Sequence, residues 1–173
     1  MFCFLLGAAK AQHHQLSDIP KLSVDDYKGE KDKGSLQPIK TNIRIYYRLD
    51  SIDTAKKNRV RLKLITKVDF YSSLSFFDST GMSETQLSNA LRHEQGRLLI
   101  AYIVANRLEK TLSNKKWSAD YRQEVKSAFY GDNHVFAELQ QQYDAITDYG
   151  KDLEAQKQWE EKLSELFNQT IRK

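Results

Sequence analysis

Apolar and polar residues alternate along two stretches in the first half of the chain. Residues 43–49 read Ile-Arg-Ile-Tyr-Tyr-Arg-Leu, and residues 59–64 read Arg-Val-Arg-Leu-Lys-Leu, with the same phase continuing to Phe70. A period of two predicts half-buried β-strands. The polar stretch 50–58 between them predicts a loop, and therefore an antiparallel pair. A third strand is predicted at residues 73–77.

The pattern changes to a helical period after Ser83. Residues 83–86 read Ser-Glu-Thr-Gln, which is the capping box that begins many helices. Apolar residues then recur at helical spacing: Leu87, Leu91, Leu98, Ala101, Ala105, Leu108 and Leu112. Gly96 interrupts this helix at a cost of about 1 kcal/mol relative to alanine. We therefore expect another segment to cross the helix closely at that position.

Three further helices are predicted after the long one. The first runs from a cap at Ser118 to a stop at Gly131, the second covers residues 135–146 and ends by Gly150, and the third covers residues 159–167. Strands followed by helices predict an α+β domain. The expected fold is a small antiparallel sheet packed against a long central helix and further C-terminal helices.

Length and composition fit one globular domain. The chain has 173 residues, of which 29% are charged and 40% hydrophobic, with a formal net charge of +4. This mild excess of basic residues is too scattered to predict nucleic-acid binding. No run of eighteen apolar residues occurs, which argues against a membrane-spanning helix.

The first residues predict an export signal. An apolar run at 2–9 is followed by Ala9-Lys10-Ala11, the small-x-small form that signal peptidase cleaves. Cleavage after Ala11 predicts a periplasmic or secreted protein and removes Cys3, leaving no thiol chemistry. A basic n-region is missing, which suggests a truncated or misassigned start. Residues 12–38 are then a polar lead-in, and residues 39–173 a single domain.

Residues 93–97, His-Glu-Gln-Gly-Arg, are one substitution away from the zinc-peptidase signature H-E-x-x-H. In that signature two histidines four apart bind zinc from one helix face, and the glutamate activates the metal-bound water. Here the second histidine is replaced by Arg97, a permanent cation that cannot ligate a metal.

Five separated segments, including this one, form an ordered set. They are Leu-Ser-Val-Asp-Asp-Tyr-Lys-Gly at 22–29, Ser-Phe at 75–76, Leu-Arg-His-Glu-Gln-Gly at 91–96, Gln-Tyr-Asp-Ala-Ile-Thr-Asp-Tyr-Gly at 142–150, and Gln156 with Trp159. Together they resemble a bacterial domain family of unknown function whose members are described as secreted zinc-dependent proteases. The matching family elements are D-F-x-G, Ser-Trp, L-x-H-E-Q-G-H, Q-x-Y-D-x-x-T-x-H-G and Q-x-x-W. The resemblance extends from about residue 22 to residue 166.

The resemblance implies a zinc-peptidase-like fold and a metal triad of three histidines. Carried over residue by residue, His93 and Glu94 are kept, whereas Arg97 and Tyr149 stand at the other two ligand positions. A unit charge about 4 Å from a dication, at an effective dielectric near 20, costs on the order of 8 kcal/mol. A side chain that swings aside would reduce this penalty. We therefore expect no bound cofactor, and Arg97 to replace the metal cation by pairing with Glu94 or another carboxylate.

Some residues offer ways to rebuild the site. Tyr149 as a phenolate and His134 are the weaker candidate ligands that would join His93. His13 and His14 would bind metal adventitiously. The pair Asp144 and Asp148, four apart on a predicted helix face, is interpreted as solvated.

Three hypotheses follow. The first is a catalytically inactive, zinc-peptidase-like binding or scaffold module, with an unknown protein or peptide as partner. The second is an active metallopeptidase with zinc in a site rebuilt around His93, where Glu94 is the general base. The third is a structural envelope protein that contacts an acidic polymer through a basic strand face made of Arg59, Arg61, Lys63 and Lys67.

Overall fold

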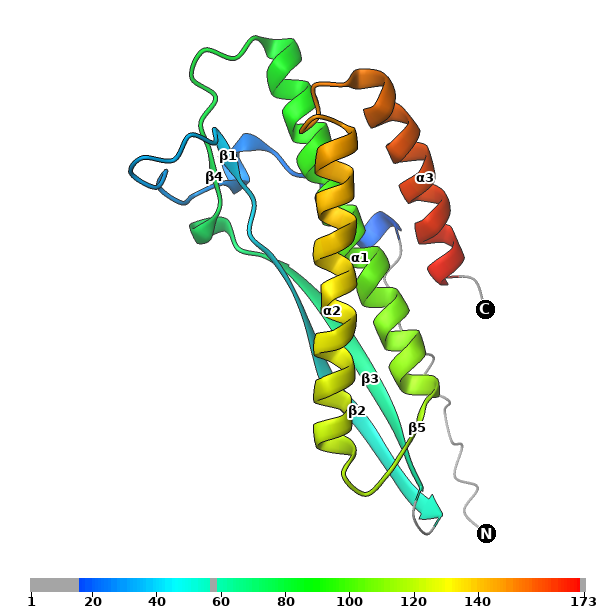
Figure 1. The fold of residues 1–173 in the computed structure, drawn as a ribbon. Coiled ribbons are helices and arrows are strands. Elements are labelled where there is room, and N and C mark those ends of the chain that lie inside the picture. The colour runs from blue at the N-terminus through cyan, green and yellow to red at the C-terminus, as the bar shows by residue number, and fades with distance from the viewer. Residues whose placement is uncertain (1–15, 57–58, 172–173) are drawn as a thin grey trace, which may run out of the picture.

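The computed structural model describes residues 16–56 and 59–171. The predicted signal peptide, 1–11, and the pair His13 and His14 lie outside the described residues, so export stays a prediction. The chain forms an α+β fold, as predicted. A long helix, α1 (Glu84–Asn114), lies at the centre. It packs on a β-hairpin with one side and on two further helices with the other (Figure 1).

The hairpin is longer than the sequence predicted. Strand β2 (Ile43–Lys56) pairs antiparallel with β3 (Arg59–Phe70), so most of the expected loop at 50–58 is strand. The alternation is interrupted at Asp50-Ser51 and resumes in the other phase at Ile52, and two register shifts absorb the irregular residues of β2. The prediction of a nine-residue loop was wrong because polarity alone was taken as a loop signal.

Two short pairings complete the β-structure of the described residues. Strand β1 (Ile39–Lys40) pairs with β4 (Phe76–Phe77), and β5 (Lys116–Trp117) pairs with the start of β3. Only the last two residues of the predicted third strand are therefore paired as a strand. A 3₁₀ turn, Ser72–Leu74, precedes them, and the Ser75 hydroxyl donates to the carbonyl of Tyr71, a local bond that competes with strand pairing.

Helix α1 begins as predicted. The hydroxyl of Ser83 accepts from the Gln86 amide at 3.3 Å, and the Gln86 side chain accepts from the Ser83 amide at 2.8 Å. These two bonds satisfy donors that the first turn of a helix otherwise leaves unpaired. The middle of α1 is fully buried, so tertiary packing adds to this local signal.

Two of the predicted helices form one. Helix α2 (Tyr121–Ile146) runs through Gly131, and α3 (Leu153–Ile171) follows after a short turn. Gly131 was expected to stop a helix, but no atom lies within 4 Å of the Cβ position there. The apolar stripe of α2 continues across it at helical spacing: Val125, Phe129, Phe136 and Tyr143. Burial of that stripe outweighs the roughly 1 kcal/mol that a helical glycine costs.

Part of the predicted lead-in belongs to the folded unit. Leu22 and Tyr27 are buried, and the Tyr27 ring meets the edges of Phe70 and Phe77. The packed domain therefore begins well before residue 39.

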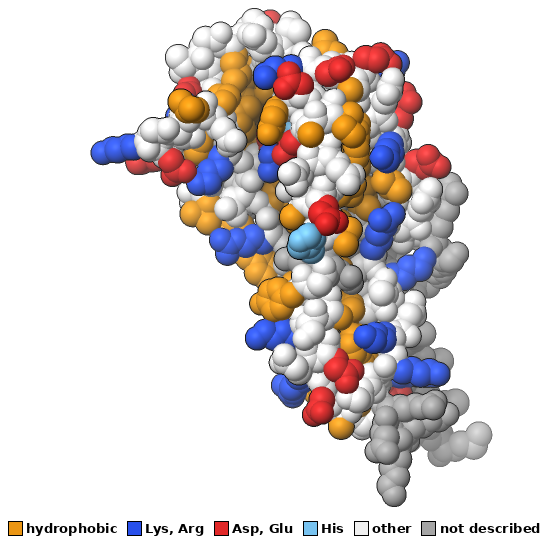
Figure 2. Space-filling model, viewed as in Figure 1, with side chains coloured by type: hydrophobic (Ala, Val, Ile, Leu, Met, Phe, Trp, Pro, Cys, Tyr) orange, Lys and Arg blue, Asp and Glu red, His pale blue; other side chains and the backbone are white. Residues whose placement is uncertain are grey.

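The surface is mixed in charge. Acidic and basic side chains are interspersed on the face shown in Figure 2. On the hairpin, Arg61 and Lys67 point outward as expected, but Lys67 pairs with Asp69 at 2.7 Å and Lys63 with Asp50 at 3.0 Å. Within the described ranges, no helix is long and apolar enough to cross a membrane.

Candidate functional site

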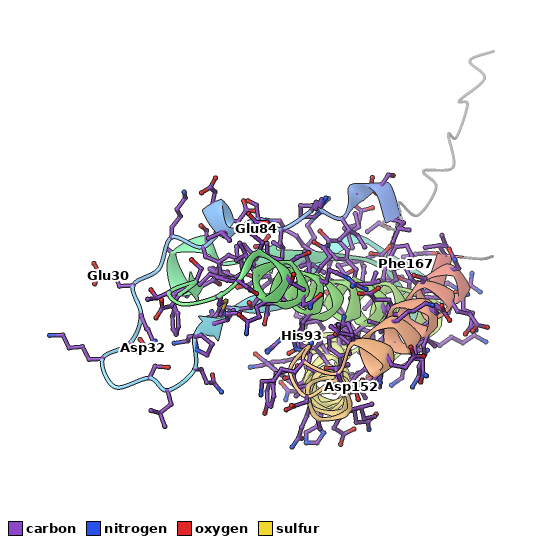
Figure 3. The ribbon with its side chains drawn as sticks, turned by 90° about the horizontal axis from the view of Figure 1, so that it is seen from above. Glu30, Asp32, Glu84, His93, Asp152 and Phe167 are labelled. Atoms are coloured by element: carbon purple, nitrogen blue, oxygen red, sulfur yellow. The ribbon has the colours of Figure 1, made fainter. Side chains whose placement is uncertain are left out.

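Three residues of the His93–Arg97 motif, His93, Gly96 and Arg97, lie on the side of α1 that faces the other helices. His93 lies next to the turn between α2 and α3, where Thr147 and Gly150 contact it (Figure 3). The His93 side chain is only 2% exposed, and that of Glu94 is 7% exposed. Any chemistry at this motif therefore has to proceed in a largely dehydrated site.

Both ring nitrogens of His93 are hydrogen bonded to protein. Nδ1 lies 3.3 Å from Gln156 Oε1 and 3.2 Å from the Thr147 hydroxyl. Nε2 lies 3.1 Å from a carboxylate oxygen of Asp144. Three residues from α2, the turn after it and α3 thus enclose one imidazole of α1, which links all three helices.

The partners of His93 are all hydrogen-bond acceptors. Thr147 donates its hydroxyl hydrogen to the carbonyl of Tyr143 at 2.7 Å, so its oxygen is free to accept. Gln156 donates its amide group to the Tyr143 hydroxyl at 2.6 Å and to Glu160, which leaves its carbonyl toward His93. An imidazole whose two nitrogens both face protein acceptors can present a nitrogen to a metal ion or a substrate only by giving up one of these hydrogen bonds.

Flat packing holds the His93 ring in this position. The ring of Tyr143 stacks on it with centroids 4.6 Å apart and planes 7° from parallel. A Cβ on Gly150 would lie 2.7 Å from the Cβ of His93, so only glycine leaves room there. Burial raises the pKa of Tyr143 well above its usual range, and the hydrogen bond from Gln156 only partly offsets it.

Gly150 is also the last of three consecutive residues with positive φ. Asp148 has φ 44°, Tyr149 53° and Gly150 82°. This left-handed turn ends α2 and reverses the chain so that α3 returns along α1. It also brings Thr147 and Gly150 against His93.

Arg97 takes a position between two carboxylates. Its Nε lies 3.7 Å from Glu94 and its Nη1 lies 3.4 Å from Asp144, the carboxylate that also binds His93. The expectation that Arg97 pairs with Glu94 or another carboxylate is therefore confirmed. Burial and, to a lesser extent, the charge of Glu94 raise the pKa of the Tyr27 phenol in the lead-in.

The two remaining residues of the motif also have packing roles. Gln95 accepts from the Leu22 amide at 2.8 Å and donates to the Pro20 carbonyl at 3.0 Å, which fastens the lead-in to α1. Gly96 faces the phenol of Tyr143, so the close crossing expected at this glycine is α2. His93, Gln95, Gly96 and Arg97 thus each contact a segment from another part of the chain, while Glu94 pairs with Arg97 within α1.

The other candidate ligands do not complete a metal site. Tyr149 is 58% exposed, with its ring 6.5 Å from that of His93 and tilted by 55°. His134 is exposed on α2 and pairs with Glu138 at 3.0 Å. Within residues 16–56 and 59–171, no three His, Cys, Asp or Glu side chains are placed to hold one ion together.

The residues present therefore do not fit a zinc ion. His93 and Asp144 supply two donors, and both are already engaged, while Arg97 brings a positive charge to the same carboxylate. Structural and catalytic zinc sites use at least three protein ligands. The geometry is that of a junction in which ion pairs and hydrogen bonds hold the helices together.

The sequence did not predict the residues that complete this junction. Asp144 is half-buried on His93 and Arg97, so its interpretation as a solvated residue was wrong. Asp148 lies beyond the end of α2, is exposed, and pairs with Lys151, so the two do not share a helix face. Thr147 and Gln156 belong to the segments that carry the family resemblance, and that was the available signal.

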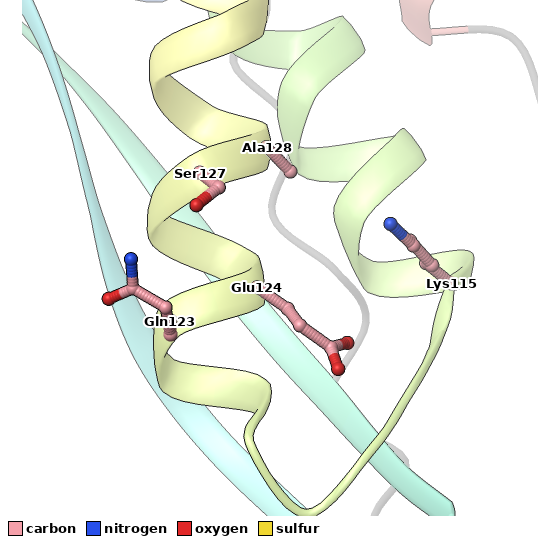
Figure 4. A pocket seen from close by; sticks show the side chains of 5 residues that line it. All are labelled: Lys115, Gln123, Glu124, Ser127 and Ala128. Atoms are coloured by element: carbon pink, nitrogen blue, oxygen red, sulfur yellow. The ribbon is translucent and has the colours of Figure 1, made fainter.

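A separate depression lies where α1 ends and α2 begins (Figure 4). It is lined by Lys115, Gln123, Glu124, Ser127 and Ala128. The hydroxyl of Ser118 donates to Glu124 and lowers the pKa of that carboxyl. Glu124 thus serves the first turn of α2, and the open lining holds no arrangement of catalytic groups.

Comparisons with family models, with curated proteins and with solved structures give no match for this chain.

Proposed function

We propose that this protein is a zinc-peptidase-like domain that works without a metal ion, as an exported binding or scaffold module. The observation that carries the proposal is the position of Arg97, whose guanidinium lies 3.4 Å from the carboxylate that binds His93. The zinc-protease resemblance would require a histidine at this position. Arginine there supplies a positive charge to one buried carboxylate, Glu94, and one partly buried carboxylate, Asp144.

The surroundings of His93 support the same proposal. A general base needs a free lone pair, and a zinc ligand needs a deprotonated nitrogen directed at the ion. Both nitrogens of His93 instead face acceptors within 3.3 Å. Glu94, the residue that would activate water, pairs with Arg97. The motif is therefore best explained as a junction that fixes α1 against α2 and α3.

If the motif is a junction, the function of the chain resides on its surface. The polymer-binding hypothesis is supported less well, because Lys63 and Lys67, two of the four cations of the predicted basic face, are paired with aspartates of the same hairpin. A protein or peptide partner is the alternative that these ion pairs leave open.

The decisive experiment is the zinc content of the mature domain, purified without a histidine tag and with His13 and His14 replaced by alanine. We expect far less than one zinc per chain, and a melting temperature that a chelator leaves unchanged. Zinc near one per chain, lost in the His93→Ala variant, would overturn the proposal. Glu94→Gln is the matched test of activity, since it would abolish hydrolysis by a rebuilt metallopeptidase.

A further inference from the structure

The outer edge of β3 is closed. The Leu64 amide donates to the Ser113 hydroxyl at 3.1 Å, and the Thr66 amide donates to the carboxylate of Glu109 at 2.8 Å. Strand β5 pairs with residues 60–61 of the same edge. Side chains of α1 and a short strand thus satisfy the backbone groups that β3 directs away from β2.

The register of the β2–β3 pair shows that backbone groups on the outer edge of β2 point away from the sheet. Tyr47 lies opposite Thr66 and Leu49 lies opposite Leu64, and the amides of both β3 partners are directed away from β2. In an antiparallel ladder such pairs exchange no hydrogen bonds. The amides and carbonyls of Tyr47 and Leu49 therefore point outward, and by alternation so do those of Ile45.

The described residues provide no partner for these outward groups. Strand β2 pairs with β3 alone, and β3 lies between β2 and β5 in the sheet. In Figure 1, β2 forms the margin of the sheet on the side away from β5. A row of unpaired backbone groups on an edge strand is a template for one more strand.

We infer that the free edge of β2, around Ile45 and Tyr47, binds an extended acidic peptide segment as an added strand. Strand addition is a common mode of peptide recognition: main-chain hydrogen bonds provide affinity, and alternate side chains provide specificity.

The charge of β2 selects an acidic partner. Arg44, Tyr46 and Arg48 project from the solvent-facing side of β2, and the Arg48 side chain is 70% exposed. Arg48 has only a long 3.8 Å contact with Asp50, and Arg44 lies over the ring of Tyr71. Residues directly opposite on an added strand lie close enough for charge pairing. Glutamate or aspartate at alternate positions would meet both arginines.

The other side of the added strand would be apolar. Tyr47 packs on Phe129 of α2 with ring centroids 4.7 Å apart, and Phe129 contacts Tyr130, which is 62% exposed. This row of rings runs from the inner face of β2 to the surface of α2. Inward side chains of an added strand would extend the hydrophobic contact that the row begins.

This surface is separate from the His93 junction. Phe129 and Asp144 are fifteen positions apart on α2, or roughly 22 Å along the helix axis. The inference rests on the proposed function, because it names the class of partner for a binding module. Its failure would leave the zinc measurement unaffected, so the two can be told apart.

The experiment uses two blocked ten-residue peptides, one alternating glutamate with valine and the other lysine with valine. Amide hydrogen exchange on the free protein should show protection at Tyr46 and Arg48 and fast exchange at Ile45 and Tyr47. The glutamate peptide should slow exchange at Ile45 and Tyr47 selectively, whereas the lysine peptide should not. Loss of the alternating pattern with no effect of the glutamate peptide would overturn the inference.

Charge reversal provides the matched variant. Arg44→Glu with Arg48→Glu should weaken binding of the glutamate peptide about tenfold and improve binding of the lysine peptide. Lys151→Glu with Lys157→Glu, a distant exposed pair, should change neither. Protection of Ile45 and Tyr47 that grows with protein concentration in the absence of peptide would identify a second copy as the occupant, which would overturn the acidic-peptide assignment.

Discussion

The phenol of Tyr143 lies where a side chain at position 96 would begin. A Cβ on Gly96 would lie 2.6 Å from Cζ of Tyr143 and closer still to its hydroxyl. The same phenol accepts from Gln156 at 2.6 Å and its ring stacks on His93. One tyrosine therefore sets both the distance between α1 and α2 and the position of the buried imidazole.

Gly96→Ala is expected to destabilise the protein by about 1–3 kcal/mol, because the new methyl group overpacks against Tyr143. Gly131→Ala is the matched control: it is also a helical glycine, but open space surrounds its Cβ position. That variant should gain roughly 0.5–1 kcal/mol from helix propensity. Denaturant unfolding of both variants gives the comparison. Equal effects would mean that the helices do not cross closely at Gly96.

Asp144→Asn should cost about 2 kcal/mol of unfolding free energy. The change removes the anion that His93 and Arg97 share, and leaves the buried guanidinium facing a neutral amide. Asp148→Asn is the control, since Asp148 is exposed and, among the described residues, pairs with Lys151 alone at 3.5 Å. We expect that control to stay within about 0.5 kcal/mol of the parent. Similar values for both variants would argue against a structural junction at Asp144.

The difference between these two aspartates shows how far the sequence could lead. Local signals were sufficient where local bonds decide the structure, as at the Ser83–Gln86 cap. They failed at Gly131, because a buried stripe extending on both sides outweighed one poor residue. Position 144 was misinterpreted because its partners, His93 and Arg97, lie about fifty residues away. No periodicity encodes which helix face will meet them.

The loss of unfolding free energy at alkaline pH should depend on Tyr143. Burial raises its pKa above the ordinary value near 10, so the unfolded chain releases this proton first. The stabilising contribution is complete below about pH 10 and is lost as the pH rises toward the folded-state pKa. Tyr143→Phe should therefore lose stability less steeply above pH 10, by at most about 1.4 kcal/mol per pH unit.

The measurement is denaturant unfolding at several pH values between neutral and strongly alkaline. Tyr143→Phe will be less stable at neutral pH, because Gln156 loses its acceptor, so only the slopes are compared. Tyr130→Phe removes an exposed phenol from the same helix and should keep the parent slope. If the unfolding free energy of Tyr143→Phe falls with the same slope as that of the parent above pH 10, ionisation of Tyr143 is not linked to unfolding.

The family resemblance makes a prediction of its own at positions 97 and 149. Arg97→His together with Tyr149→His would restore the three histidines that the resemblance implies, and would remove the guanidinium that now pairs with Asp144. His93 and position 97 are one helical turn apart, the spacing at which two imidazoles bind one zinc ion. We expect the double variant to bind about one zinc per chain and the parent protein far less.

Each single variant is the control for that experiment. Arg97→His alone supplies two imidazoles, and Tyr149→His alone keeps the repelling arginine, so both should bind zinc much more weakly than the double variant. Zinc is measured by elemental analysis after dialysis, with His13 and His14 replaced by alanine. If the double variant folds normally but binds no more zinc than the single variants, position 149 does not face the metal position. The zinc-protease resemblance would then not extend to the ligand positions, although the His93 junction would stand as described.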